Sequence, residues 1–222
     1  MATRGRKKDM VKQKIVKRWL VIAPKRVVTD VWPVEGPQWA LNLSMSLVVG
    51  TPAKRLQALR ANADVYVTNY DNLQWLADQK VSFDGVVFDE LTKLKNPSGK
   101  RFKALEKFIA NVNVRWGLTG SFTSNGLEDV FGQCKIVDQT LLGRSKGAFM
   151  QRYFVLLNPE YGEWFARPGA LPNIMQQIKP ATYLLDAGDY KDKLPPLHTV
   201  PMYCTMDMKD YNTMKRDFVV QF

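Results

Sequence analysis

Two adjacent carboxylates at the end of an apolar run are the residues in this sequence best suited to chemistry. The run Val86-Val87-Phe88 leads directly into Asp89 and Glu90. In open α/β sheets ligands bind beyond the carboxyl ends of the strands, so an acid there can hold Mg²⁺ through hard oxygen ligands. The next acid can orient and deprotonate a water that attacks a phosphoryl group. A strand that ends in a solvated acidic turn is the alternative interpretation of the same pair.

Short apolar runs alternate with helix-like stretches over the first half of the chain, and these elements must position the acids. Continuous apolar strands that alternate with helices of about 10–15 residues predict an α/β fold with a parallel sheet. The runs typical of buried strands lie at 19–24, 47–50, 63–68, 85–89 and 112–119. The stretches with helical character lie at 36–46, 52–62, 70–79 and 99–110.

The regular alternation stops after Gly120, and a more helical region follows. Residues 125–155 have helical spacing, whereas residues 156–180 are rich in aromatics, Pro and Gly and have no firm assignment. Leu194-Pro195-Pro196 is typical of a linker. The remaining expected elements are a possible strand at 181–186, a strand at 199–204 and a helix at 207–218.

The chain is strongly basic, with 32 Lys and Arg residues against 21 Asp and Glu residues and a net charge of +11. The first 20 residues hold eight of the bases and one acid, so +7 of this excess lies in a short N-terminal segment. Such a segment suits a polyanionic partner such as DNA or RNA, or it is a solvated arm without a specific partner. We interpret residues 1–18 as a basic arm.

The composition excludes several classes of protein. No run of about 18 apolar residues occurs, so no membrane span is expected, and no apolar signal region follows the basic N-terminus. Two distant cysteines and the single His198 do not supply a disulfide framework, a zinc site or a mechanism that needs two histidines. We therefore expect a protein that is not secreted and that acts in a cytoplasm, such as that of a bacterial or phage-infected cell, or in a nucleus.

The residues around the acidic pair resemble a known motif. The segment Asp89-Glu90-Leu91-Thr92-Lys93-Leu94-Lys95-Asn96 is similar to the Asp-Glu-x-x-x-x-Lys-Asn motif II of Swi/Snf-type ATPases, a branch of the DEAD/DEAH-like superfamily-two helicases. The segment 118–131 resembles motif III, with Ser121-Phe122 in place of the usual Thr-Pro. Three further matches follow in the family's order. Residues 20–25, with Trp32-x-x-Glu35, resemble motif Ia, and residues 65–71 resemble the Thr-x-Tyr segment. Lys193-Leu194-Pro195-Pro196, with the residues near Tyr211, resembles the crossing into a second lobe.

The resemblance implies a fold and a domain organisation. Residues 19–193 would form a RecA-like first lobe, a parallel sheet with helices on both faces, with a helical extension at about 125–180. Residues 194–222 would be the linker and the start of a second lobe. In this family two RecA-like lobes clamp ATP and Mg²⁺ and move on double-stranded DNA. The implied function is therefore one lobe of an ATP-dependent helicase, translocase or DNA-remodelling enzyme, and the alternative is a non-catalytic nucleic-acid-binding or adaptor protein derived from such a lobe.

The same resemblance assigns roles to individual residues. Asp89 would bind Mg²⁺, and Glu90 would activate the attacking water. Thr119, Gly120 and Ser121 of motif III would couple the nucleotide site to DNA. The residues expected to contact the phosphates of double-stranded DNA, which position a protein without reading sequence, are Lys25, Thr68, Asn69, Lys95 and Asn96.

The chain departs from the family where ATP would bind. No G-x-x-x-x-G-K-[ST] phosphate loop occurs in the sequence, and the arginines that a second lobe supplies are not matched. Such an arginine accelerates related phosphoryl transfers by about 10³–10⁵, so we expect little hydrolysis by this chain alone. Two explanations stay open. A separately encoded chain supplies the phosphate loop and the second lobe, or the lobe acts alone through its DNA face.

Overall fold

The computed structural model describes residues 16–39, 42–123, 125–158, 162–185, 198–203 and 208–217. The chain divides into two units, residues 1–182 and 183–222. The first 15 residues of the expected basic arm and the expected linker at 194–196 lie outside the described residues. No helix among the described residues is long and apolar enough to cross a membrane.

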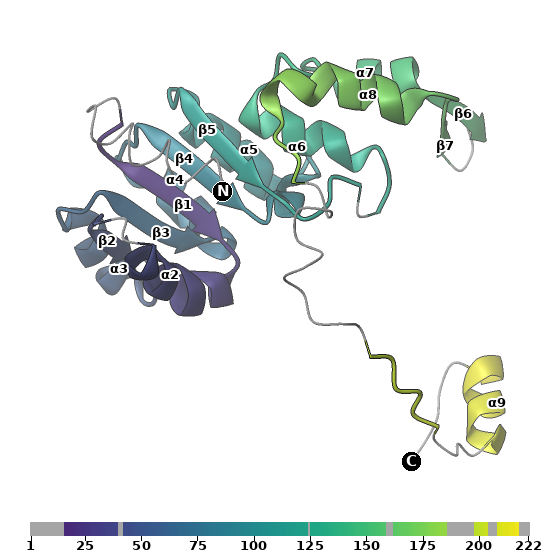
Figure 1. The fold of residues 1–222 in the computed structure, drawn as a ribbon, viewed down its shortest axis with the longest axis horizontal. Coiled ribbons are helices and arrows are strands. Elements are labelled where there is room, and N and C mark those ends of the chain that lie inside the picture. The colour runs from purple at the N-terminus through teal and green to yellow at the C-terminus, as the bar shows by residue number, and fades with distance from the viewer. Residues whose placement is uncertain are drawn as a thin grey trace. The chain divides into compact units, whose positions relative to one another are not determined.

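A five-stranded parallel sheet forms the centre of the first unit (Figure 1). Its strands are β1 (Trp19–Ala23), β2 (Met45–Leu47), β3 (Val65–Asn69), β4 (Gly85–Asp89) and β5 (Val114–Leu118). They lie in the order β2-β3-β1-β4-β5, and every pair of neighbours is parallel. The inner strands are buried along almost their whole length, which is why the sequence shows them as continuous apolar runs.

Helices cover both faces of the sheet, and the predicted RecA-like α/β fold is confirmed (Figure 1). Side chains alternate along a strand, so Leu20 and Ile22 face one core whereas Trp19 and Val21 face the other. The first core is closed by α3 (Pro52–Arg60), η2 (Tyr70–Asn72), α4 (Leu73–Ala77) and α5 (Lys100–Phe108). The second core is closed by η1 (Val27–Val31) and α2 (Trp32–Gln38).

The predicted helix at 36–46 is wrong, because two elements share that segment. The helix α2 begins earlier, at Trp32, and Pro33 stands in its first turn, where a missing N–H leaves no extra group unsatisfied. Residues 45–47 form β2 and pair with β3 instead. Pairing within the sheet therefore overrides the helical spacing of these few residues, which a pattern of hydrophobic residues alone does not reveal.

A second hydrophobic cluster organises the region after β5. Phe131, Phe149 and Ile174 lie at its centre and are almost completely buried. The predicted helix over 125–155 is two helices, and the unassigned region 156–180 holds a hairpin and a helix. These elements are α6 (Asp129–Val137), α7 (Lys146–Tyr153), β6 (Phe154–Asn158), β7 (Glu163–Ala166), α8 (Ala170–Ile178) and η4 (Lys179–Ala181). We call residues 125–182 the helical extension.

The C-terminal predictions have mixed outcomes. The helix predicted at 207–218 is confirmed as α9 (Met208–Asp217). The strand predicted at 199–204 is wrong for the described residues 199–203, and the possible strand at 181–186 is wrong for the described residues 181–185. Both segments are apolar, but neither has a neighbouring strand to pair with in the described structure.

The thiol of Cys134 on α6 is buried in the helical extension, and we predict that it is unreactive in the folded protein. Burial, aided by the charge of Asp138, raises the pKa of Cys134 to about 12. The thiolate is the reactive form, so native protein of a Cys204→Ser variant should titrate no thiol at pH 8 and one thiol in denaturant. Because the folded pKa lies above the unfolded value near 9, the free energy of unfolding should fall as pH rises from about 9 to 12. A native thiol that reacts at once would contradict this burial.

Candidate functional site

The carboxyl ends of the parallel strands meet at one edge of the sheet, and the predicted site residues follow them. The strand register places Asn69 beside the end of β1 and Asp89 beside Leu118 at the end of β5. Lys25 lies two residues beyond β1, and Thr119 directly follows β5. The topology therefore gathers residues that are far apart in sequence along one edge, where ligands bind in open α/β sheets.

Asp89 and Glu90 are held in defined positions at this edge. Trp32 Nε1 donates a hydrogen bond to Asp89 Oδ2 at 2.9 Å, which links the start of α2 to the acidic pair. Glu90 adopts a left-handed backbone conformation with φ of 60°, which is uncommon for a residue with a side chain. The Thr92 hydroxyl donates a hydrogen bond to the Glu90 carboxylate. Such backbone strain, of order 1–3 kcal/mol, persists where the surrounding structure holds it, and often at functional sites.

The Tyr70 hydroxyl holds the backbone of the same turn. It donates to the carbonyl oxygen of Asp89 at 2.9 Å and to that of Glu90 at 3.3 Å. Burial, with the charges of Asp89 and Glu90, holds the pKa of Tyr70 far above its ordinary value near 10. The hydroxyl therefore keeps its proton, and remains a donor, throughout the neutral pH range.

We predict that Tyr70→Phe loosens the turn after β4. Removing a buried hydroxyl that serves two carbonyl groups should lower the free energy of unfolding by about 1–3 kcal/mol. It should also speed hydrogen exchange of the amides at 90–94, measured by mass spectrometry or NMR. The control is Tyr66→Phe, since the Tyr66 hydroxyl donates to Ala61 O at 2.5 Å, away from the acidic pair. Equal exchange at 90–94 in both variants would contradict the positioning role of Tyr70.

The acidic pair fits Mg²⁺ better than a transition metal. Among the described residues, no group of three or more His, Cys, Asp or Glu side chains is placed to hold a metal ion. Mg²⁺ needs only one or two carboxylates, because waters and substrate phosphates complete its shell. Asp89, with one carboxylate oxygen oriented by Trp32, would supply such a ligand beside Glu90.

The loop that follows the acids is fixed to α6. Lys95 Nζ lies 3.0 Å from Asp129 Oδ2, and the two side chains are 31% and 12% exposed. Gly132 on the same helix approaches the backbone of η3 (Leu91–Leu94) and Lys95 so closely that a Cβ atom there would lie 2.1 Å from Lys95 O. Lys95, predicted to contact DNA, thus has a structural ion pair, whereas the neighbouring Asn96 is exposed.

Thr68 and Asn69 lie inside the lobe. Thr68 is fully buried, and its hydroxyl donates to Val48 O at 2.9 Å. Asn69 is 7% exposed and accepts a hydrogen bond from the Asn72 amide at 2.5 Å. Neither side chain is accessible to a DNA phosphate in this structure. The exposed candidates at this edge are Lys25 and Asn96.

Thr119, Gly120 and Ser121 form a turn directly after β5. The Thr119 hydroxyl donates to Ser121 O at 2.8 Å, and it accepts from the Ser121 backbone N–H at 3.2 Å. Gly120 is exposed, and a Cβ atom at this position would meet open space. The turn therefore presents polar groups at the same sheet edge as Asp89, beside the strand that ends in the acids.

Three residues of the site were not predicted as such. Trp32 and Tyr70 both belong to segments that carried the family resemblance, yet their contacts with Asp89 and Glu90 join residues 57, 19 and 20 positions apart. Asp129 lies 34 positions from its partner Lys95. The family motifs that contain these residues were the only signal in the sequence that could have pointed to them. Motifs that follow the ends of parallel strands meet at one edge of the sheet, so their residues are candidates for contact with the acids.

The fold and the acidic sheet edge are those of a RecA-like lobe. The chain belongs to the SNF2-related domain family, whose model matches residues 3–215. It is 37% identical over 196 residues to putative protein p41 of Acyrthosiphon pisum secondary endosymbiont phage 1, a match that spans 82% of this chain and 43% of that protein. It is 29% identical over 140 residues to the TATA-binding protein-associated factor mot1 of Aspergillus fumigatus, which spans 60% of this chain and 7% of that protein.

Solved structures share the fold. The Sulfolobus solfataricus SWI2/SNF2 ATPase core in complex with dsDNA superimposes with a TM-score of 0.60 at 24% identity, covering 78% of this chain and 34% of that one. The core domain from the same organism gives a TM-score of 0.58 at 23% identity, covering 95% and 42%. The chain therefore spans less than half the length of each of these four proteins.

Proposed function

We propose that the chain is a Swi/Snf-type lobe that binds double-stranded DNA and contributes the acidic motif of an ATP-dependent DNA translocase or remodelling enzyme. The observation that carries the proposal is the shared sheet edge. At this edge, Trp32 and Tyr70 hold Asp89 and Glu90 at the end of β4. The exposed Lys25 follows β1, the strand next to β4. The structural match to a SWI2/SNF2 core in complex with dsDNA supports the choice of ligand.

Each group at the edge has a proposed role. Asp89 binds Mg²⁺ and Glu90 activates the water that attacks ATP. Lys25 and Asn96 contact DNA phosphates directly, and Lys95 positions Asn96 through its ion pair with Asp129. Thr68 and Asn69 shape the neighbouring strand end from inside the lobe, and the turn Thr119-Gly120-Ser121 relays movement between the nucleotide and DNA.

Hydrolysis needs groups beyond those in this sequence. The 222 residues contain no G-x-x-x-x-G-K-[ST], whose backbone N–H groups and lysine hold the phosphates in this class of enzyme. We propose that a phosphate loop and a second lobe from outside these 222 residues complete the nucleotide site. The phage source of one relative favours a setting in phage-infected bacterial cells.

Two assays on the purified chain test this function. It should bind a short DNA duplex with an affinity that falls steeply with salt, because Lys and Arg contacts to phosphates release counterions. It should hydrolyse ATP negligibly, with or without the duplex. Robust turnover that survives Glu90→Gln would contradict the assigned roles. A chain without residues 1–15, which keeps the buried Val16, should still bind. Complete loss of binding on that deletion would favour an adaptor that uses the basic arm alone.

A further inference from the structure

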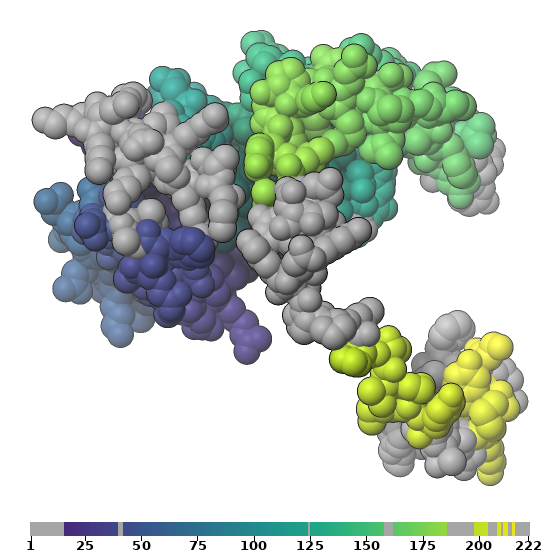
Figure 2. Space-filling view, in the orientation of Figure 1, coloured from purple at the N-terminus to yellow at the C-terminus, as the bar shows by residue number. Residues whose placement is uncertain are grey.

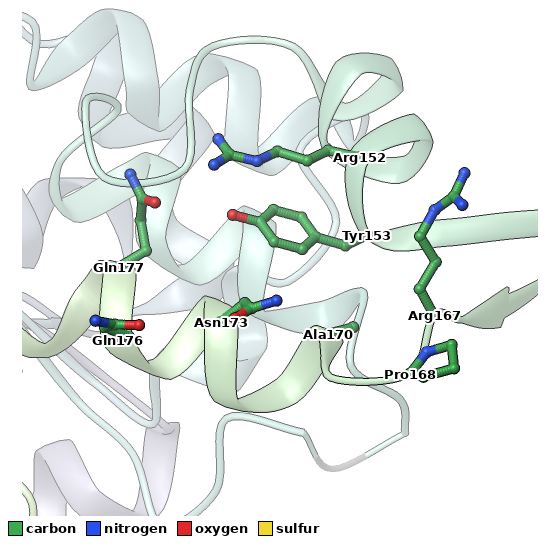
Figure 3. A pocket seen from close by; sticks show the side chains of 8 residues that line it. All are labelled: Arg152, Tyr153, Arg167, Pro168, Ala170, Asn173, Gln176 and Gln177. Atoms are coloured by element: carbon green, nitrogen blue, oxygen red, sulfur yellow. The ribbon is translucent and has the colours of Figure 1, made fainter.

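A hollow on the helical extension has the chemistry of an anion site, and its lining residues are distinct from those of the sheet edge. It has a volume of about 640 Å³ and is lined from α7, from the turn between β7 and α8, and from α8 itself (Figure 3). We call it the α7–α8 hollow. Its polar lining consists of Arg152, Tyr153, Arg167, Asn173, Gln176 and Gln177.

The two arginines keep their charge available for a ligand. Arg152 Cζ lies 5.2 Å from the centroid of the Tyr153 ring, and Arg167 Nη2 donates to Gln151 O at 3.4 Å. Within the described ranges, neither guanidinium forms an ion pair with a carboxylate. A guanidinium without a carboxylate partner suits phosphate, because its planar fork of donors matches two phosphate oxygens.

Rigid elements present these two side chains. Arg152 lies in the last turn of α7, next to Tyr153, which is only 6% exposed. The backbone N–H of Arg167 donates to Tyr153 O at 2.9 Å, so the second arginine is tied to the same residue. Gly169, with φ of 77°, then turns the chain into α8 in a conformation that favours glycine. The backbones of both arginines therefore lie at one corner of the extension, and their side chains extend from it in different directions (Figure 3).

The openness of the hollow favours a polymer over an enclosed small molecule. Both arginines and the three amide side chains, Asn173, Gln176 and Gln177, are exposed. The space-filling view shows α8 and the β6–β7 hairpin on the outside of the first unit (Figure 2). Arginine, asparagine and glutamine side chains are common donors to the phosphates of nucleic acids, in contacts that carry no sequence information.

We propose that the α7–α8 hollow binds the phosphodiester backbone of double-stranded DNA, as a second contact surface besides the sheet edge. The proposal rests on the proposed function in one respect, because both take duplex DNA as the ligand. Free inorganic phosphate shares the chemistry of the backbone and is separated from it by the experiment.

The test compares two double variants of the full chain. Arg152→Gln/Arg167→Gln should bind a short duplex about 10-fold more weakly at low salt, and the dependence of log affinity on log salt should become shallower by about 2. The control is Arg144→Gln/Lys146→Gln, which removes two exposed charges from the segment before and at the start of α7, outside the lining. It should change affinity by less than about 3-fold. All four side chains are exposed, so the thermal midpoints should match that of the wild type.

Each other result overturns the proposal in a recognisable way. Equal losses in both double variants would mean that only net charge matters. If Lys25→Gln weakens binding while Arg152→Gln/Arg167→Gln does not, the hollow is no DNA contact and the proposed function stands. If the wild type does not bind duplex DNA, the proposed function and the DNA contact at the hollow are both wrong. If calorimetry shows that inorganic phosphate binds and that the variant abolishes this without affecting DNA affinity, the hollow takes free phosphate only.

Discussion

Replacing Gly132 by alanine should destabilise the first unit by about 3 kcal/mol or more, near the upper end of the range for overpacked sites. A Cβ atom at this position would lie 2.1 Å from Lys95 O and 2.8 Å from Leu94 O, and these are backbone atoms that cannot rotate away. The helix α6 must then move off the loop that follows the acids. Chemical denaturation measures the free energy, and the thermal midpoint should fall by roughly 6–12 °C.

The control for this substitution is Gly147→Ala. Gly147 lies in α7, where the nearest atom to a new Cβ would be Ser145 Oγ at 3.7 Å, an ordinary contact. Alanine is the better helix former by about 1 kcal/mol, so this variant should be neutral or slightly stabilised. A Gly132→Ala protein as stable as the Gly147→Ala protein would show that α6 does not pack closely on the Lys95 loop.

Glu90→Gln should lower ATP turnover by about 10²–10⁴-fold once the chain is combined with a phosphate loop and a second lobe. Glutamine keeps the shape of the side chain but cannot accept the proton of the attacking water. Asp89→Asn should be comparably inactive, because it weakens the proposed hold on Mg²⁺. Steady-state ATPase assays of the assembled enzyme with duplex DNA measure the loss.

The matched control for the acids is Glu106→Gln on α5, which removes a carboxylate that pairs with Lys135 at 3.2 Å. It should leave turnover within about 2-fold of the wild type, since Glu106 is not among the groups proposed to bind Mg²⁺, ATP or DNA. DNA affinity should be retained in Glu90→Gln, because the DNA contacts are proposed for other side chains. Turnover in Glu90→Gln that equals turnover in Glu106→Gln would remove Glu90 from the mechanism.

The sheet was predictable from the sequence, because parallel strands that are buried on both faces consist of unbroken apolar runs. The segments at 19–24, 63–68 and 85–89 each became a strand of the sheet, within two residues at either end. The short edge strand β2 was harder, since its three half-buried residues carry little pattern and gain their conformation from pairing with β3. The β6–β7 hairpin was missed for a similar reason, because exposed aromatics on β7 break the expected alternation.

The site was predictable in its motifs but not in its contacts. Asp89 and Glu90 could be placed at a strand end from local sequence alone. The hydrogen bonds from Trp32 and Tyr70 could not, because they depend on how α2 and η2 pack against the sheet. The burial of polar side chains was also not predictable. Thr68 is a polar residue and was expected to contact DNA, but its hydroxyl is buried because it donates a hydrogen bond to Val48 O.

The most direct measurement of the central claim is the affinity of the chain for a short DNA duplex across a salt series. Lys25→Gln should weaken binding and reduce the slope of log affinity against log salt by about 1, as expected for one lost phosphate contact. Arg60→Gln is the matched control, because Arg60 is exposed beside Arg18 and Asp64, at the amino ends of the strands. That variant should keep the wild-type slope. Salt-independent binding, or equal slopes for Lys25→Gln and Arg60→Gln, would contradict a DNA-binding face at the carboxyl edge of the sheet.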